Sequence, residues 1–156
     1  MHQRTNELVK VLFDLGSDAW HGNATKTVWA ENVTPDRFRL RNVPFYAFGV
    51  SNEDVVLAHK DGHVFVFDGV SIQAGHSTYR IILNATTQRN DFDRAWLPLE
   101  ELGCNYEEGP GTLKAVDVPA SVDIAQVYQL LEAGERDGVW DFEEGHCGHP
   151  AQEPAA

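Results

Sequence analysis

The stretch that decides how the N-terminal half folds is Arg37–Val56, RFRLRNVPFYAFGVSNEDVV. Its first residues alternate strictly in polarity, so that apolar side chains share one face of a strand and arginines share the other. The pattern therefore predicts a half-buried strand with a cationic outer face. The apolar residues are Phe38 and Leu40, and the arginines are Arg37, Arg39 and Arg41.

The flanking segments place this strand in a small, curled antiparallel sheet or barrel over residues 1–74. Thr27–Val33 alternates in the same way, and the turn Thr34-Pro35-Asp36 joins it to the arginine strand as a hairpin. Val9–Leu15 has the composition of either a strand or a short helix. Two more strands are expected at Asp54–His59 and His63–Val70, on either side of the turn Lys60-Asp61-Gly62.

The second half, residues 75–147, predicts the element order βαββαβ, which is the ferredoxin-like plan. Its second helix has an apolar stripe, with Asp123 placed as an N-terminal cap and Gly138 as a C-terminal glycine. Its first helix contains Pro98, which predicts a kink or a restart. The expected elements are strands at Thr78–Asn84, Asn105–Glu108, Thr112–Val118 and Val139–Glu143, and helices at Asp91–Gly103 and Asp123–Asp137.

The fold class that follows is α+β, with the antiparallel sheet or barrel docked on the ferredoxin-like unit. The joint between the halves, Gln73–Ser77, is too short for a free linker, so we expect the two halves to be in contact. The end of the chain, from Gly145 onward, contains Pro, Ala and Glu and is expected to be frayed, with residues 148–156 as a flexible tail.

Several runs of residues resemble a bacterial family of domains of unknown function. They are RxRLRNVPFYAFGVSxxDVV, AGHSTYRI, LEELGCxYE, AVDVP and GVWxxEEGHC, and they extend from about Val28 to Cys147. The resemblance implies no established activity and carries over no catalytic residue.

The charge balance bounds the partners of this protein. With 24 acidic and 12 basic residues the formal net charge is −12, which disfavours nucleic acid and anionic membranes as partners. No apolar run is long enough to span a bilayer, and the N-terminus lacks the apolar core of a signal peptide. We therefore expect a cytoplasmic protein, in which Cys104 and Cys147 are more often free than bridged.

Two groups of polar residues could bind an anionic ligand. The arginine face could hold a phosphate or carboxylate, with Arg80 joining it from the next domain, or it could pair with the protein's own acids. The run Gly75–Thr78 could line a pocket at the joint, or could only hold the halves together. No acid is visible behind the His76 imidazole, so no catalytic residue is expected. With the polar residues of the Asn42–Val50 turn, the ligand-binding candidates are Arg39, Arg41, Asn42, Tyr46, His76, Ser77 and Arg80.

The run Glu143–His149, EEGHCGH, contains one Cys and two His within four residues. Such a cluster could bind zinc, but structural zinc needs four ligands in well-separated pairs. A chance cluster in a loose tail is the preferred interpretation, so neither a metal nor a cofactor is expected.

The leading hypothesis is a non-enzymatic acidic binding protein, and its specific form is an immunity-type inhibitor of a basic toxin or nuclease. Its acidic surface would steer association with a basic protein partner. The alternative is a regulator that binds an anionic metabolite at the joint, and a third possibility is an enzyme that uses His76 and Arg80. The candidate partner-binding residues are Glu107, Glu108, Asp141, Glu143 and Glu144.

Overall fold

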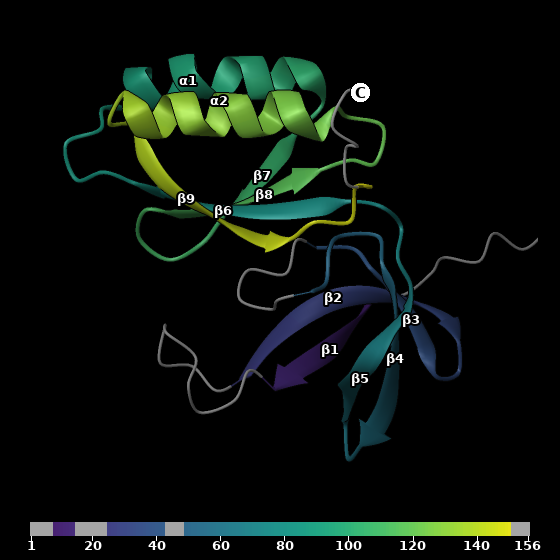
Figure 1. Cartoon of the computed structure of the whole chain (residues 1–156). Coiled ribbons are helices and arrows are strands. Elements are labelled where there is room, and N and C mark those ends of the chain that lie inside the picture. Colours follow the sequence, from purple (N-terminus) through teal and green to yellow (C-terminus); the bar gives the residue numbers. More distant parts are fainter. Residues whose placement is uncertain (1–7, 15–24, 43–48, 151–156) are drawn as a thin grey trace, which may run out of the picture.

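The computed structural model describes residues 8–14, 25–42 and 49–150. Figure 1 shows two parts: a small barrel, and a four-stranded sheet that carries two helices on the face turned away from the barrel. Neither helix in these ranges has the length and apolar character needed to cross a membrane.

The N-terminal part is a closed barrel of five strands in sequence order. Neighbouring strands pair antiparallel, so the first and the fifth point the same way, and the barrel closes through a short parallel contact of Val11 with Phe65 and Leu12 with Val66. The strands are β1 (Leu8–Asp14), β2 (Thr25–Thr34), β3 (Arg37–Leu40), β4 (Val55–Asp61) and β5 (Val64–Ile72).

The barrel interior is filled by the apolar residues that the alternation predicted to be inside. Phe38 and Leu40 are fully buried, and Phe13 stacks on Phe67 with ring centroids 4.5 Å apart. The predicted hairpin around Pro35-Asp36 and the turn at Gly62 are confirmed. The described part of the ambiguous segment Val9–Leu15, up to Asp14, is a strand, and Leu15 lies outside the described residues.

The C-terminal part has the order β6 (Ser77–Leu83), α1 (Arg89–Leu102), β7 (Asn105–Glu108), β8 (Leu113–Val118), α2 (Ile124–Arg136) and β9 (Trp140–His146). Its sheet has the order β7-β8-β6-β9 and is antiparallel throughout. One core lies between this sheet and the helices, where buried Trp140 donates a hydrogen bond from Nε1 to the Leu131 carbonyl at 2.9 Å.

The helix ends follow the predicted capping signals. The Asp123 carboxylate accepts from the Ala125 N–H at 2.9 Å, and Gly138 has the positive φ of 75° expected of a C-terminal glycine. The predicted restart at Pro98 is wrong, because α1 continues as one helix through this residue. Trp96 and Leu99 on either side of Pro98 are both buried against the core, and this packing holds the helix together.

The expected fold class is corrected by these observations. The described residues form nine strands in two sheets of five and four strands with only two helices, so the fold is mostly β rather than a ferredoxin-like βαββαβ unit docked on a sheet. The N-terminal strands, expected as either a sheet or a barrel, close into a barrel with an apolar core of its own.

The end of the chain is more ordered than we expected. Strand β9 continues through His146, and His149 is only 9% exposed. Residues 148–150 therefore do not form a loose tail, whereas residues 151–156 lie outside the described part. The expected boundary at residue 74 falls between β5 and β6.

Candidate functional site

The two parts meet at a polar joint built around the tight turn Ser51–Asp54. The Asp54 carboxylate is fully buried and accepts from two backbone N–H groups, that of Ser51 at 2.9 Å and that of Ala74 at 2.8 Å. The hydroxyls of Ser51 and Thr78 share a buried hydrogen bond of 2.6 Å across the joint. Glu53 in this turn has a φ of 70°, which is unfavourable for a residue with a side chain. The joint therefore holds a strained turn through buried hydrogen bonds.

His76 has an acidic partner in this joint. Its Nδ1 lies 2.8 Å from Oδ1 of Asp117, and the other oxygen of Asp117 accepts from the Asn52 side-chain amide at 3.4 Å. These residues come from three segments: the link before β6, strand β8 and the turn after the arginine strand. Asp117 thus orients the imidazole and also ties the barrel to the sheet. Among the described residues, the side-chain oxygen of Asn52 and Nε2 of His146 are buried and have no hydrogen-bonding partner.

Ser77 belongs to a different hydrogen-bonded chain. Its hydroxyl oxygen accepts from the Gly148 N–H at 3.0 Å and lies 2.6 Å from Nδ1 of His149, whose Nε2 lies 3.0 Å from the Pro119 carbonyl oxygen. Since the carbonyl can only accept, Nε2 carries the proton and the serine hydroxyl donates to Nδ1. Both residues are buried. This chain fastens the end of the protein to the sheet.

The structure does not bring the predicted arginines together. Arg80 lies on the second sheet, where it is 1% exposed and 3.4 Å from Oε1 of Glu143. Arg39 and Arg41 lie on the barrel, and Arg41 is paired with Glu53 at 2.9 Å. Both Arg41 and Arg80 thus have carboxylates of this chain as partners, which was the competing interpretation of the cationic face.

Of the two polar residues of the Asn42–Val50 turn, Asn42 lies within the described part of the chain. The Asn42 side-chain oxygen accepts from the backbone N–H of Trp29 at 2.8 Å, and its Nδ2 donates to Oε1 of Glu107 at 3.3 Å. Asn42 thus links the barrel to β7. Tyr46 lies outside the described residues.

The acidic candidates divide between two edges and two faces of the four-stranded sheet. The strand order puts Glu107 and Glu108 on β7 at one edge, and Asp141, Glu143 and Glu144 on β9 at the other. Glu107 and Glu143 belong to one cross-strand row with Arg80 and Ala115, so they share the face without helices. Glu108 pairs with Lys114, and Glu144 lies 3.5 Å from the Tyr79 hydroxyl, both on the helix face. The five residues therefore do not form one patch.

The EEGHCGH run is used for packing in the described structure. A side chain at Gly145 would meet the Arg80 guanidinium at 2.8 Å, and Gly148 lies directly against the backbone of His76. No group of three metal-ligating side chains occurs within the described residues. Both cysteines are free: Cys147 is exposed, whereas burial, reinforced by the Asp117 charge, raises the pKa of the Cys104 thiol to about 12.

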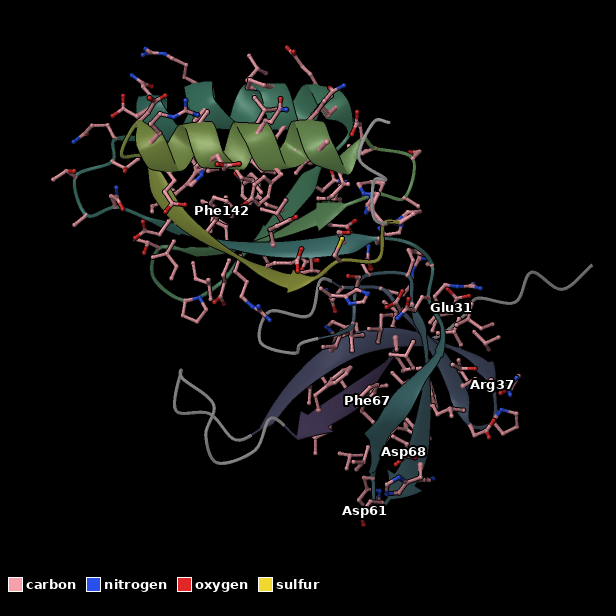
Figure 2. All side chains as sticks on the ribbon, viewed as in Figure 1. Glu31, Arg37, Asp61, Phe67, Asp68 and Phe142 are labelled. Carbon is pink, nitrogen blue, oxygen red and sulfur yellow. The ribbon has the colours of Figure 1, made fainter. Side chains whose placement is uncertain are left out.

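Two open clefts lie away from the joint. One of about 520 Å³ at the ends of the helices is lined by Thr86, Arg94, Asp91 and Asp137, so its single arginine faces two carboxylates. The other, of about 560 Å³, lies beside the β4–β5 hairpin, where His59 Nδ1 is 2.8 Å from Asp68. Asp68 is labelled in Figure 2. Both clefts are open to solvent, and in both the cationic side chains share the lining with carboxylates. Neither cleft is therefore a strong site for an anionic metabolite.

Comparison with known proteins places the chain. A family model described as "Domain of unknown function (DUF4265)" matches residues 26–142, which is most of the sequence. The chain belongs to the DUF4265 family. The suspected resemblance to a family of unknown function is thereby confirmed.

One solved structure shares the DUF4265 chain's fold. It is described as a "hypothetical protein from Neisseria gonorrhoeae", is 18% identical, and superposes with a TM-score of 0.71 over 96% of this chain and 100% of its own. At this identity the likeness shows the fold alone. No curated protein matches the chain significantly.

Sequence reasoning missed Asp117 and Asn52, which complete the joint of this DUF4265 chain. A signal for Asp117 was present, because it is the acidic residue of AVDVP in a strand whose residues are all buried. A buried acid requires a partner, so that position could have been matched with His76. Asn52 carried no comparable signal, since its contact with Asp117 joins residues 65 positions apart.

Proposed function

We propose that this protein is a non-enzymatic binding module whose acidic sheet edge receives a basic protein partner in the cytoplasm. An immunity-type inhibitor of a basic toxin or nuclease is the specific form of this proposal. The net charge of −12 supports it, because long-range attraction accelerates association with a cationic protein.

The observation that carries the proposal is the acidic edge formed by β9. In the described part of the chain β9 pairs in the sheet only with β6. The Gly145 carbonyl near its end accepts from the Gly49 N–H at 3.2 Å, and the acidic stretch before Gly145 forms a sheet edge whose other side presents backbone donors and acceptors. Asp141, Glu143 and Glu144 are all exposed on this strand. Charges on an edge also discourage self-association. Here they do so selectively, because they repel a second acidic copy and attract a basic segment.

The alternative, a regulator that binds an anionic metabolite at the joint, has less support. An anion at Arg41 would compete with Glu53 at 2.9 Å, and an anion at Arg80 would compete with Glu143 at 3.4 Å. It would also have to reach a guanidinium that is 1% exposed. A melting shift with a panel of anionic metabolites, abolished in Arg80→Ala, would favour this alternative.

The test of the binding proposal is co-expression with the product of the neighbouring gene. We expect the two to co-purify, and the Asp141→Lys/Glu143→Gln variant to bind at least tenfold more weakly. The matched control is Glu132→Lys/Glu135→Gln, which changes the net charge equally at two exposed positions of α2. A neighbour that never co-purifies, or equal binding by both variants, would overturn the proposal.

A further inference from the structure

The outside of β1, β2 and β3 combines exposed apolar residues with cations. Strand register places Lys10 opposite Trp29, and Glu31 between Leu8 and Arg39. Because Val28 and Ala30 point into the core, these residues point outward. Figure 2 shows Glu31 and Arg37 on one side of the barrel. We call this surface the Trp29 face; it comprises Leu8, Lys10, Trp29, Val33, Arg37, Arg39 and Arg41.

Three large apolar side chains of the Trp29 face are open to solvent. Leu8 is 49% exposed, Trp29 is 44% exposed and Val33 is 46% exposed. The backbone of Trp29 is held in the barrel wall, because its backbone N–H donates to the Asn42 side chain at 2.8 Å and its carbonyl accepts from the Arg41 N–H at 2.9 Å. A half-exposed tryptophan beside arginines has the composition of the energetic centre of protein interfaces.

The charge of the Trp29 face is opposite to that of the whole chain. Arg37 and Arg39 make no ion pair with any carboxylate of the described residues, although acids outnumber bases by 24 to 12. Arg41 is paired with Glu53 and lies 3.9 Å from Glu31, and the Lys10 ammonium lies 5.1 Å from the centre of the Trp29 ring. Arg37 and Arg39 therefore provide positive charge beside the exposed apolar residues that no carboxylate of the described residues neutralises in an ion pair.

We propose that the Trp29 face docks an acidic segment of a protein partner that places an apolar side chain against Trp29. An outer barrel face cannot enclose a metabolite, and neither cleft described above is lined by its residues. Leu8 and Val33 offer apolar contact that a phosphate backbone does not use, and this favours a protein segment over a polynucleotide. This surface lies on the barrel and is independent of the β9 edge.

The test is selection from a random dodecapeptide library displayed on phage, with counter-selection against Trp29→Ala. We expect the enriched peptides to combine Asp or Glu with aromatic or aliphatic residues. Measured by fluorescence anisotropy, their affinity should fall at least tenfold in Trp29→Ala and in Arg39→Glu, and should fall as salt rises. The Asp141→Lys/Glu143→Gln variant should bind within twofold of the wild type, and circular dichroism verifies that each variant is folded.

Three outcomes would overturn the inference. Enriched peptides could lack acidic residues, or could bind Trp29→Ala and Arg39→Glu as tightly as the wild type. A labelled dodecathymidine could bind as tightly as the best peptide and lose this binding in Trp29→Ala, which would assign the face to single-stranded nucleic acid. Basic peptides that depend on Asp141 and Glu143 would support only the β9 proposal, so the two proposals fail separately.

Discussion

Replacing Gly134 by alanine is expected to destabilise the protein, although helix propensity alone predicts the opposite. Gly134 lies in α2 and is buried. A Cβ at this position would lie 2.3 Å from Cε2, 2.4 Å from Cζ2 and 2.6 Å from Nε1 of Trp140. Trp140 cannot easily move away, because it is fully buried and bonded to the Leu131 carbonyl.

The expected magnitude follows from three opposing contributions. Forcing an extra carbon into a packed core costs about 1–3 kcal/mol. Displacing the indole from the Leu131 carbonyl costs about 1 kcal/mol more, and the better helix propensity of alanine returns about 1 kcal/mol. The net loss is about 1–3 kcal/mol, which for a chain of this length lowers the melting temperature by about 3–10 °C.

Urea denaturation of four variants checks this reasoning. Gly134→Ala should lose stability in the wild-type background and should be neutral or stabilising in a Trp140→Leu background, where the obstructing ring is gone. Ala133→Gly reports the propensity effect at the neighbouring position. A Gly134→Ala protein that is more stable than the wild type, or an equal loss in both backgrounds, would refute the packing argument.

Three further predictions concern the end of the chain, the thiols and α1. Urea denaturation of His149→Ala should show a free energy of unfolding about 1–3 kcal/mol lower than that of the wild type, because Ser77 and Pro119 lose a buried hydrogen-bonding partner. The control is His63→Ala at an exposed position, and equal effects of the two substitutions would contradict the attachment of residues 148–149 to the sheet. At pH 8 Ellman's reagent should modify Cys147 at once and Cys104 only when the protein unfolds, and two thiols that both react fast would argue against a buried Cys104. The pKa of the Cys104 thiol is about 12 in the folded protein and near 8.5 in the unfolded chain, so the free energy of unfolding should also fall as pH rises from about 8.5 to about 12. Pro98→Ala should raise the melting temperature by restoring a hydrogen bond inside α1, and a lower melting temperature would show that the ring is needed there.

Local patterns predicted most of the elements in this protein. The alternation at Phe38 and Leu40, the cap at Asp123 and the glycine at position 138 depend on residues only a few positions apart. Such signals survive without any knowledge of the fold. Pro98 misled for the same reason, because its local preference was outweighed by burial of Trp96 and Leu99.

The candidate site was only partly predictable. His76 lies at the joint and Ser77 begins the strand beside it, but their partners are Asp117 and His149, 41 and 72 positions away. For the Trp29 face, the alternation of residues 37–41 predicted the outward-facing arginines. The opposition of Lys10 and Trp29 depends on the register of β1 with β2, which a sequence does not display.

The sequence by itself determined the strands, the turns, the outward-facing arginines and the acidic balance, because each follows from composition or from short-range periodicity. Tertiary structure alone decided that the first five strands close into a barrel, through two residue pairs that join β1 to β5. It also decided that Arg80 is buried beneath Glu143 while Arg39 is partly exposed on the other sheet. These outcomes depend on contacts between distant segments, whose closure is favourable only when the whole core has assembled.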